Sequence, residues 1–245
     1  MTDGVVEVGA GGSAERLVLG IDTCGPSGSV ALARILGNRV ELLGQIELAG
    51  RSYSATLVTA VGEILNRAGV KLHKIATIAA VSGPGSFTGV RVGLSAVKGL
   101  AEPSGIPVAV VSRLAVLAYK AGLDSAVLDA HRHEVFLRVS GAGARVREVL
   151  AGQAELAAIN PQPAEIAVCD DEAAALLSEV WPATRLVRVE APNAANAIEL
   201  AKPKILACEF VDLALLDGHY LRRSDAEIFG PVRGGEAAAA GRTRA

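Results

Sequence analysis

Residues 16–48 read RLVLGIDTCGPSGSVALARILGNRVELLGQIEL and contain three apolar runs separated by turn residues. The first run, 16–22, indicates a buried strand that ends at an acid. The second and third runs, 28–36 and 39–48, indicate two further strands, and the Gly-Asn pair between them favours a hairpin turn. This part of the chain therefore predicts three sequential strands.

The rest of the chain extends and then repeats this order of elements. Apolar residues at helical spacing over 52–68 predict a helix. The other predicted elements of the first half are a strand at 75–81, a helix at 90–102 and a strand at 107–111. The second half has predicted strands at 126–129, 134–139, 146–150, 166–169 and 185–189, and helices at 153–159, 171–180 and 193 to about 213. Each half reads βββαβαβα, which favours a duplicated α/β unit.

The repeated order predicts two α/β domains, over 16–111 and 112–229. The flanking segments, 1–15 and 230–245, are rich in Gly and Ala and predict disordered tails.

Composition restricts the classes of function. The chain has 245 residues, 3% of them aromatic, and a formal net charge of −2. A protein that holds nucleic acid unaided usually has a basic face and aromatic stacking platforms, so direct RNA binding is not indicated. The sequence shows neither the apolar run of a signal peptide nor eighteen consecutive apolar residues, so we expect a cytoplasmic protein without a membrane span.

Residues that often bind metals are scattered. Cys24, Cys169 and Cys208 lie far apart and form no CxxC pair, so neither a disulfide framework nor a zinc knuckle is indicated. His131 and His133 would share one face of a strand, but no third ligand is placed near them. They indicate a solvated strand end, and no metal site is predicted.

The densest motif is SGPGSFTGVR at 82–91, which follows a buried strand and opens a helix. Ser86 or Thr88 can cap that helix, whose free N–H groups and positive dipole end suit an anion. A tight turn that requires glycine is the alternative interpretation. A P-loop is excluded because no Gly-Lys-Ser/Thr follows, and the Gly85-to-Gly89 spacing does not fit the Rossmann fingerprint.

The helix after this motif carries small residues three or four positions apart, which are Gly89, Gly93, Ala96 and Gly99. Such spacing lets another backbone approach closely. The helix at 52–68 has an apolar face wider than the usual stripe, which indicates burial on two sides. Together they favour a helix-to-helix contact with another subunit, and simple packing on the sheet is the alternative. The candidate interface residues are Leu57, Val61, Ile64, Gly89, Gly93 and Ala96.

Several segments together resemble the TsaB (YeaZ) family. They are 19–23 (LGIDT), 29–32 (SVAL), 82–91, 106–112, 128–130 with 134–136, and 220–225 (YLRRSD). The resemblance extends from about residue 17 to 229, and GPGSFTGVR is its most specific stretch. Over 140–195 only the order of elements matches. The resemblance implies the two-lobed actin-like fold of sugar kinases and heat-shock ATPases.

The resemblance also implies a non-catalytic role as a scaffold that activates a larger relative, TsaD. That relative transfers a threonylcarbamoyl group onto the adenosine beside the tRNA anticodon, an ATPase named TsaE joins the pair, and tRNA is reached only through the complex. The metal-binding His-x-x-x-His of TsaD is replaced here by Arg113 and Leu117. The sequence departs from the family pattern at Tyr53 and at His131. Without the partner, a homodimer through the same helices is expected.

The alternative function is an actin-like, ATP-dependent kinase of small molecules. An acid and hydroxyls at a first hairpin can hold Mg²⁺ and phosphate in such kinases, so ATP or ADP with Mg²⁺ is a candidate ligand near the partner interface. The candidate contacts are Asp22, Thr23, Gly83, Gly85, Ser86 and Thr88. The same residue types are ordinary in turns, which is the competing interpretation.

Overall fold

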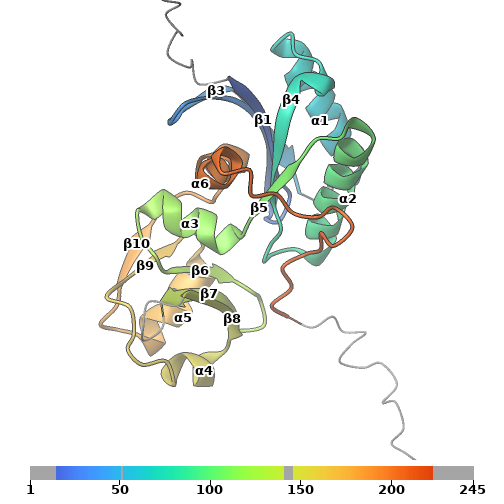
Figure 1. The fold of residues 1–245 in the computed structure, drawn as a ribbon. Helices are drawn as coiled ribbons and strands as arrows, with labels where there is room; N and C mark the ends of the chain where they lie inside the picture. The colour runs from blue at the N-terminus through green and yellow to red at the C-terminus, as the bar shows by residue number, and fades with distance from the viewer. Residues whose placement is uncertain (1–14, 51, 141–145, 223–245) are drawn as a thin grey trace, which may run out of the picture.

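The computed structural model describes residues 15–50, 52–140 and 146–222 and consists of two lobes, each built on a five-stranded sheet (Figure 1). The first sheet has the order β3-β2-β1-β4-β5, in which β1 pairs antiparallel with β2 and parallel with β4. Its strands are β1 (Arg16–Asp22), β2 (Ser27–Leu36), β3 (Arg39–Ala49), β4 (Ile75–Val81) and β5 (Val108–Val111).

The second sheet repeats the first. Read from one edge, its order is β8-β7-β6-β9-β10, with β6 antiparallel to β7 and parallel to β9. Its strands are β6 (Ala126–Asp129), β7 (Val135–Ser140), β8 (Val146–Ala151), β9 (Glu165–Val168) and β10 (Arg185–Arg188). The predicted βββαβαβα repeat and the two-lobed actin-like fold are confirmed.

Helices cover both faces of each sheet. In the first lobe α1 and α2 lie on one face and α6 lies on the other, while α3 packs against the second sheet (Figure 1). The helices are α1 (Tyr53–Arg67), η1 (Leu72–Lys74, a single 3₁₀ turn), α2 (Phe87–Ser104), α3 (Arg113–Ala121), α4 (Gln153–Ala157), α5 (Asp171–Val180) and α6 (Ala194–Leu206). Among the described residues, no helix is long and apolar enough to cross a membrane.

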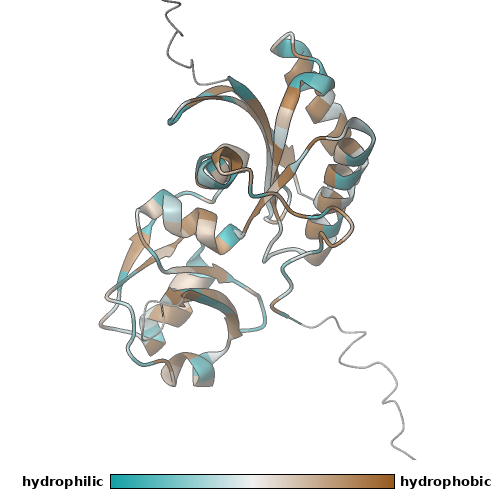
Figure 2. Ribbon diagram, viewed as in Figure 1, coloured by the Kyte–Doolittle hydropathy of each residue, from teal (hydrophilic) through white to brown (hydrophobic). Residues whose placement is uncertain are grey.

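The core is aliphatic, because the chain has few aromatic residues to place there. Hydrophobic residues run along β4 and β5 at the centre of the molecule (Figure 2). The second lobe buries the one tryptophan, Trp181, whose indole N–H donates to the carbonyl oxygen of Leu156 at 2.9 Å. Hydrogen bonding of this N–H allows the large ring to be fully buried.

Helix α6 differs most from the sequence-based expectation. It ends at Leu206 and not near 213, and the chain then turns with Cys208 in the left-handed region at φ 56°. Although it comes from the second half, its buried residues Ala197 and Ile198 belong to the core of the first lobe.

The close approach of α6 requires Gly20 on β1, because a Cβ there would lie 2.6 Å from the carbonyl oxygen of Ala194. A continuous second domain over 112–229 therefore does not describe this helix. Residues 223–229 and the predicted tails, apart from Glu15, lie outside the described residues.

The position of α6 gives a stability prediction. Ile198→Ala should lower the free energy of unfolding by about 2–5 kcal/mol, because it removes a fully buried side chain between α6 and the first sheet. Urea denaturation of the whole chain measures this. Leu215→Ala is the control, since Leu215 is 81% exposed and its loss should change the value by less than about 0.5 kcal/mol. Equal effects of the two substitutions would contradict the packing of α6.

Candidate partner-binding face and interlobe cleft

The glycine-rich motif forms the turn between β4 and α2. Ser86 caps α2, and its hydroxyl accepts a hydrogen bond from the backbone N–H of Gly89 at 3.2 Å. The helix begins at Phe87, three residues before the predicted start, which places Thr88 inside its first turn. Capping by Ser86 is therefore confirmed, whereas Thr88 does not cap.

The glycines of the motif let α2 and its turn pack against the segment after β1. A Cβ at Gly85 would clash with the carbonyl oxygen of Cys24, and one at Gly89 or Gly93 would clash with Thr23. The hydroxyl of Thr23 in turn donates to the carbonyl oxygen of Gly89 at 2.7 Å. Close packing inside the first lobe therefore accounts for Gly85, Gly89 and also Gly93, which lies just beyond the motif. The alternative interpretation of the motif, a tight turn that requires glycine, agrees with the φ of 111° at Gly83.

Asp22 and Arg113 form a buried ion pair beside this turn. Asp22 is 1% exposed; its Oδ1 accepts the backbone N–H of Cys24 at 2.8 Å, and its Oδ2 lies 3.5 Å from Nε of Arg113. Burial is the strongest influence and acts to lower the pKa of Arg113, but the interactions with Asp22, Cys24 and Cys169 together outweigh it and the pKa is raised. The carboxylate is thus engaged within the protein.

A cleft of about 1300 Å³ separates the lobes. Loop 24–26 and the start of α2 line it on one side, and the turn after β6 and the segment 219–222 line it on the other. At its rim the guanidinium of Arg91 lies 3.6 Å above the ring of Phe87, which lies 5.2 Å from the ring of Tyr220. The buried side chain of Arg113 also contributes to the lining.

The residues predicted to contact a nucleotide do not all face this cleft. Asp22 and Thr23 are buried with internal partners, and Gly83 packs near the carbonyl oxygen of His219. Gly85, Ser86 and Thr88 do line the cleft. These residues do not fit a Mg²⁺–nucleotide held by Asp22, while a nucleotide contact at the start of α2 stays a prediction.

The two histidines after β6 lie in a turn and not in a strand. His131 and His133 have φ values of 61° and 60°, and β7 begins only at Val135. The Nδ1 atom of His131 lies 2.6 Å from Oδ2 of Asp129. In the described ranges, no group of three or more His, Cys, Asp or Glu side chains is placed to hold a metal ion.

The candidate interface residues require a correction. Leu57, Val61 and Ile64 are buried in the core of the first lobe, because their helical spacing defines the stripe that faces the sheet. Gly89 and Gly93 are buried against Thr23. Ala96 alone of the six is partly exposed, and it packs against the edge of the same core.

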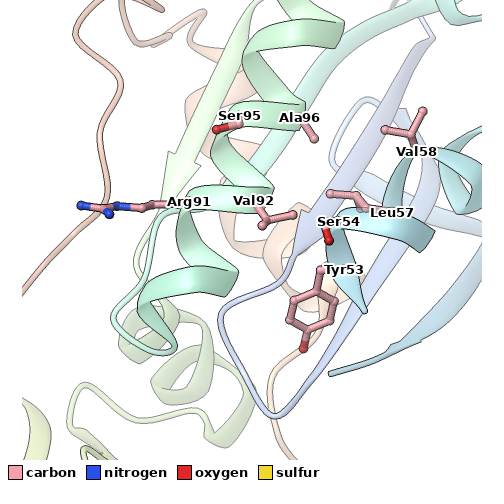
Figure 3. Close-up of a pocket in the computed structure, with 8 residues that line it drawn as sticks. All are labelled: Tyr53, Ser54, Leu57, Val58, Arg91, Val92, Ser95 and Ala96. Atoms are coloured by element: carbon pink, nitrogen blue, oxygen red, sulfur yellow. The ribbon is translucent and has the colours of Figure 1, made fainter. Parts of the chain in front are cut away.

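The exposed side of the two helices forms a shallow groove of about 330 Å³ (Figure 3). It is lined by Tyr53, Ser54, Leu57, Val58, Arg91, Val92, Ser95 and Ala96. Val58 is 60% exposed, and Figure 3 shows Arg91 extending away from the space between the helices. The wide apolar face of the 52–68 helix indicates Val58, whereas Ser54, Val92 and Ser95 belong to no periodic or motif pattern in the sequence.

Tyr53 closes the lower end of the groove. Its hydroxyl donates to the carbonyl oxygen of Gly25 at 2.8 Å, and its ring packs near Gly28. Burial, followed by the charge of Asp22, raises the pKa of Tyr53 to about 12. The departure from the family pattern at this position therefore serves the packing of α1 on the loop after β1.

Comparison with known proteins agrees with this architecture. The family model for TsaD, tRNA N6-adenosine threonylcarbamoyltransferase, matches residues 44–167, which is half of the chain. The TsaB protein of Haemophilus influenzae, a tRNA threonylcarbamoyladenosine biosynthesis protein, is 35% identical over 125 residues, covering 49% of this chain and 51% of that protein. The chain spans about half the length of the curated TsaB relatives it matches.

Two solved structures cover more of the fold. A Pseudomonas aeruginosa protein described as uncharacterized, with similarity to peptidase YeaZ, superposes with a TM-score of 0.69 at 27% identity over 84% of this chain and 100% of that one. YeaZ from Pseudomonas aeruginosa superposes with a TM-score of 0.65 at 25% identity over the same shares. The chain belongs to the family defined by the threonylcarbamoyltransferase model. Within that family it is a member of the TsaB (YeaZ) group.

Two glycines of α2 provide a matched test of the packing argument. Gly93→Ala should destabilise the protein by about 1–3 kcal/mol, because the new Cβ overpacks the contact with Thr23. Gly99→Ala should stabilise it by about 0.5–1 kcal/mol, since nothing lies near that position and alanine favours the helix. Thermal or urea denaturation measures both values. If Gly93→Ala also stabilised the protein, the close approach of α2 to Thr23 would be wrong.

Proposed function

We propose that this protein is a non-catalytic scaffold subunit in the formation of threonylcarbamoyladenosine on tRNA. Its partner is a TsaD-like transferase, which it activates by binding, and a TsaE-like ATPase joins the pair. The support is the family match and the names of the TsaB relatives. With a net charge of −2, the chain reaches tRNA only through the complex, in the cytoplasm.

The exposed groove between α1 and α2 carries this proposal. Apart from Arg91, which extends away from the space between the helices and lies over Phe87, its outer residues are aliphatic or small. A helix of another subunit can therefore approach closely without burying an uncompensated charge. In the single chain the apolar side chain of Val58 is exposed to water. Because the TsaD family model matches this same chain, the partner is expected to present helices of the same kind. In its absence two copies pair through this face with two-fold symmetry.

The chemistry of the first lobe supports a role without catalysis. The places of the metal-binding histidines of TsaD are held by Arg113 and Leu117, which are not metal ligands. Burial, and next the charge of Asp22, raises the pKa of the Cys24 thiol well above its usual value, so that thiol is not a nucleophile at neutral pH. The kinase alternative requires Asp22 to bind Mg²⁺, and Asp22 is already paired with Arg113.

Reconstitution tests this function. The chain and the TsaD-like protein of the same genome should elute together in size-exclusion chromatography at micromolar concentration. The modification of tRNA by the transferase with TsaE should stop when this chain is omitted. Separate elution, together with full modification in its absence, would contradict the proposal. Modification by this chain alone would contradict its non-catalytic part.

The groove gives a specific prediction for the contact. Val58→Asp should weaken binding to the TsaD-like protein by about 10- to 100-fold, because it buries an unpaired charge at the interface. Leu42→Asp is the matched control, since Leu42 is 52% exposed on the edge strand β3, away from the groove. Isothermal titration calorimetry measures both. Equal affinity of the two variants would place the contact elsewhere.

A further inference from the structure

Arg113 is a buried cation that the proposed function does not use. It is the first residue of α3, is 5% exposed, and its guanidinium lies against Gly25 and Asp22 at the cleft. Within the described part of the chain, its Nε atom has no hydrogen-bond partner, and Asp22 is the carboxylate within 4 Å of it. The two side chains attract each other as opposite charges, with Nε of Arg113 3.5 Å from Oδ2 of Asp22.

Asp22 needs such a cation because it is sealed from water. A carboxylate taken out of water without a counter-charge is strongly unfavourable, so it either binds a cation or becomes protonated. One hydrogen bond, from the N–H of Cys24, reaches it from its own loop. The side chain of Arg113 supplies the opposite charge from another element.

The two members of this pair come from elements that serve different sheets, although the backbone N–H of Arg113 donates to the carbonyl oxygen of Gly83 in the first lobe at 2.7 Å. Asp22 ends β1 in the first sheet. Arg113 begins α3, whose residues Leu114 and Leu117 pack in a cluster with Leu128 and Phe136 of the second sheet. The pair thus links the end of β1 to the start of the helix that packs on the second sheet, beside the cleft.

We propose that Arg113 is a resident cation that permanently occupies the acidic end of the cleft and ties the two lobes together without a ligand. The guanidinium supplies the charge that a divalent cation would have to supply beside Asp22. Cation and guanidinium exclude each other there, so the protein takes no Mg²⁺–nucleotide through Asp22. The inference goes beyond the scaffold function, because it concerns the cleft and is independent of the partner.

A comparison of neutralised variants tests the pair. Arg113→Met leaves Asp22 buried without a counter-charge and should lower the Tm by about 10 °C. The double variant Asp22→Asn/Arg113→Met removes both charges and should recover at least half of that loss, because no buried charge is left unpaired. Arg113→Lys keeps the charge and should lose less than Arg113→Met. Losses that simply add in the double variant would overturn the proposal.

The control pair is Arg188 and Asp171, whose side chains lie 2.7 Å apart and are exposed on the second lobe. Arg188→Met, Asp171→Asn and their combination should each shift the Tm by no more than about 2 °C, as for other surface pairs. Recovery in the buried pair without recovery in this control supports an effect of burial. The same recovery in both pairs would contradict it.

A binding measurement gives a second test that does not use a variant of Arg113. Binding is measured up to millimolar concentration, by electron paramagnetic resonance with Mn²⁺ and by thermal shift with Mg²⁺ and ATP. We expect neither method to detect a binding site that is lost in Asp22→Asn. Binding that is lost in Asp22→Asn but retained in Arg188→Met would overturn the resident-cation proposal. It would leave the scaffold function untouched, because that function is tested by co-elution with the transferase.

Discussion

The close contact of α2 with the end of β1 is the constraint on which both surfaces of the first lobe depend. Gly89 and Gly93 allow the helix to lie directly against Thr23, whose hydroxyl bonds back to the helix. This contact sets how closely α2 packs on the sheet beside α1 and so shapes the groove between the two helices. It also places the capped start of α2 at the edge of the interlobe cleft.

A second set of contacts holds the lobes together behind the cleft. The carboxylate of Glu148 accepts from the hydroxyl of Ser112 at 2.6 Å, lies 2.8 Å from Nη1 of Arg138, and lies 2.8 Å from Nε2 of His219. Burial acts to raise the pKa of Glu148, but the contacts from His219, Ser112 and Arg138 outweigh it and lower the pKa. One carboxylate of the second sheet therefore binds two of the segments that pass between the lobes, at Ser112 and at His219. A charged Glu148 favours a single arrangement of the lobes.

The sequence predicted the order of elements well, because that order depends on local periodicity. The runs at β1, β2 and β4 are apolar enough to identify buried strands without tertiary information. The packing of α6 on the first sheet cannot be predicted from local periodicity. It depends on the absence of a Cβ at Gly20, which lies far from α6 in the sequence. The periodicity of a helix indicates which of its faces is apolar, but it does not indicate which sheet that face packs against.

The site residues show the same limit more sharply. The spacing of Leu57, Val61 and Ile64 correctly marks an apolar helix face, but the strongest stripe of a helix faces its own core. An exposed contact surface is indicated by apolar residues outside this core-facing stripe, and Val58 is one of them. Asp22 was a candidate ligand because acids after a first strand can bind cations. The pairing with Arg113, ninety-one positions further along the chain, emerges only when the fold brings them together.

The groove and the cleft are neighbours and share part of their lining. Four residues contribute to both, which are Tyr53, Ser54, Arg91 and Val92. Arg91 is held above Phe87 at the start of α2, and Phe87 contacts Tyr220 of the segment that crosses to the second lobe. A subunit docked on α2 therefore acts on the same helix turn that meets this crossing segment. The ion pair of Arg113 and Asp22 lies beside the same cleft, so the docking proposed on α2 would meet elements that this pair already links, and little ordering would oppose binding.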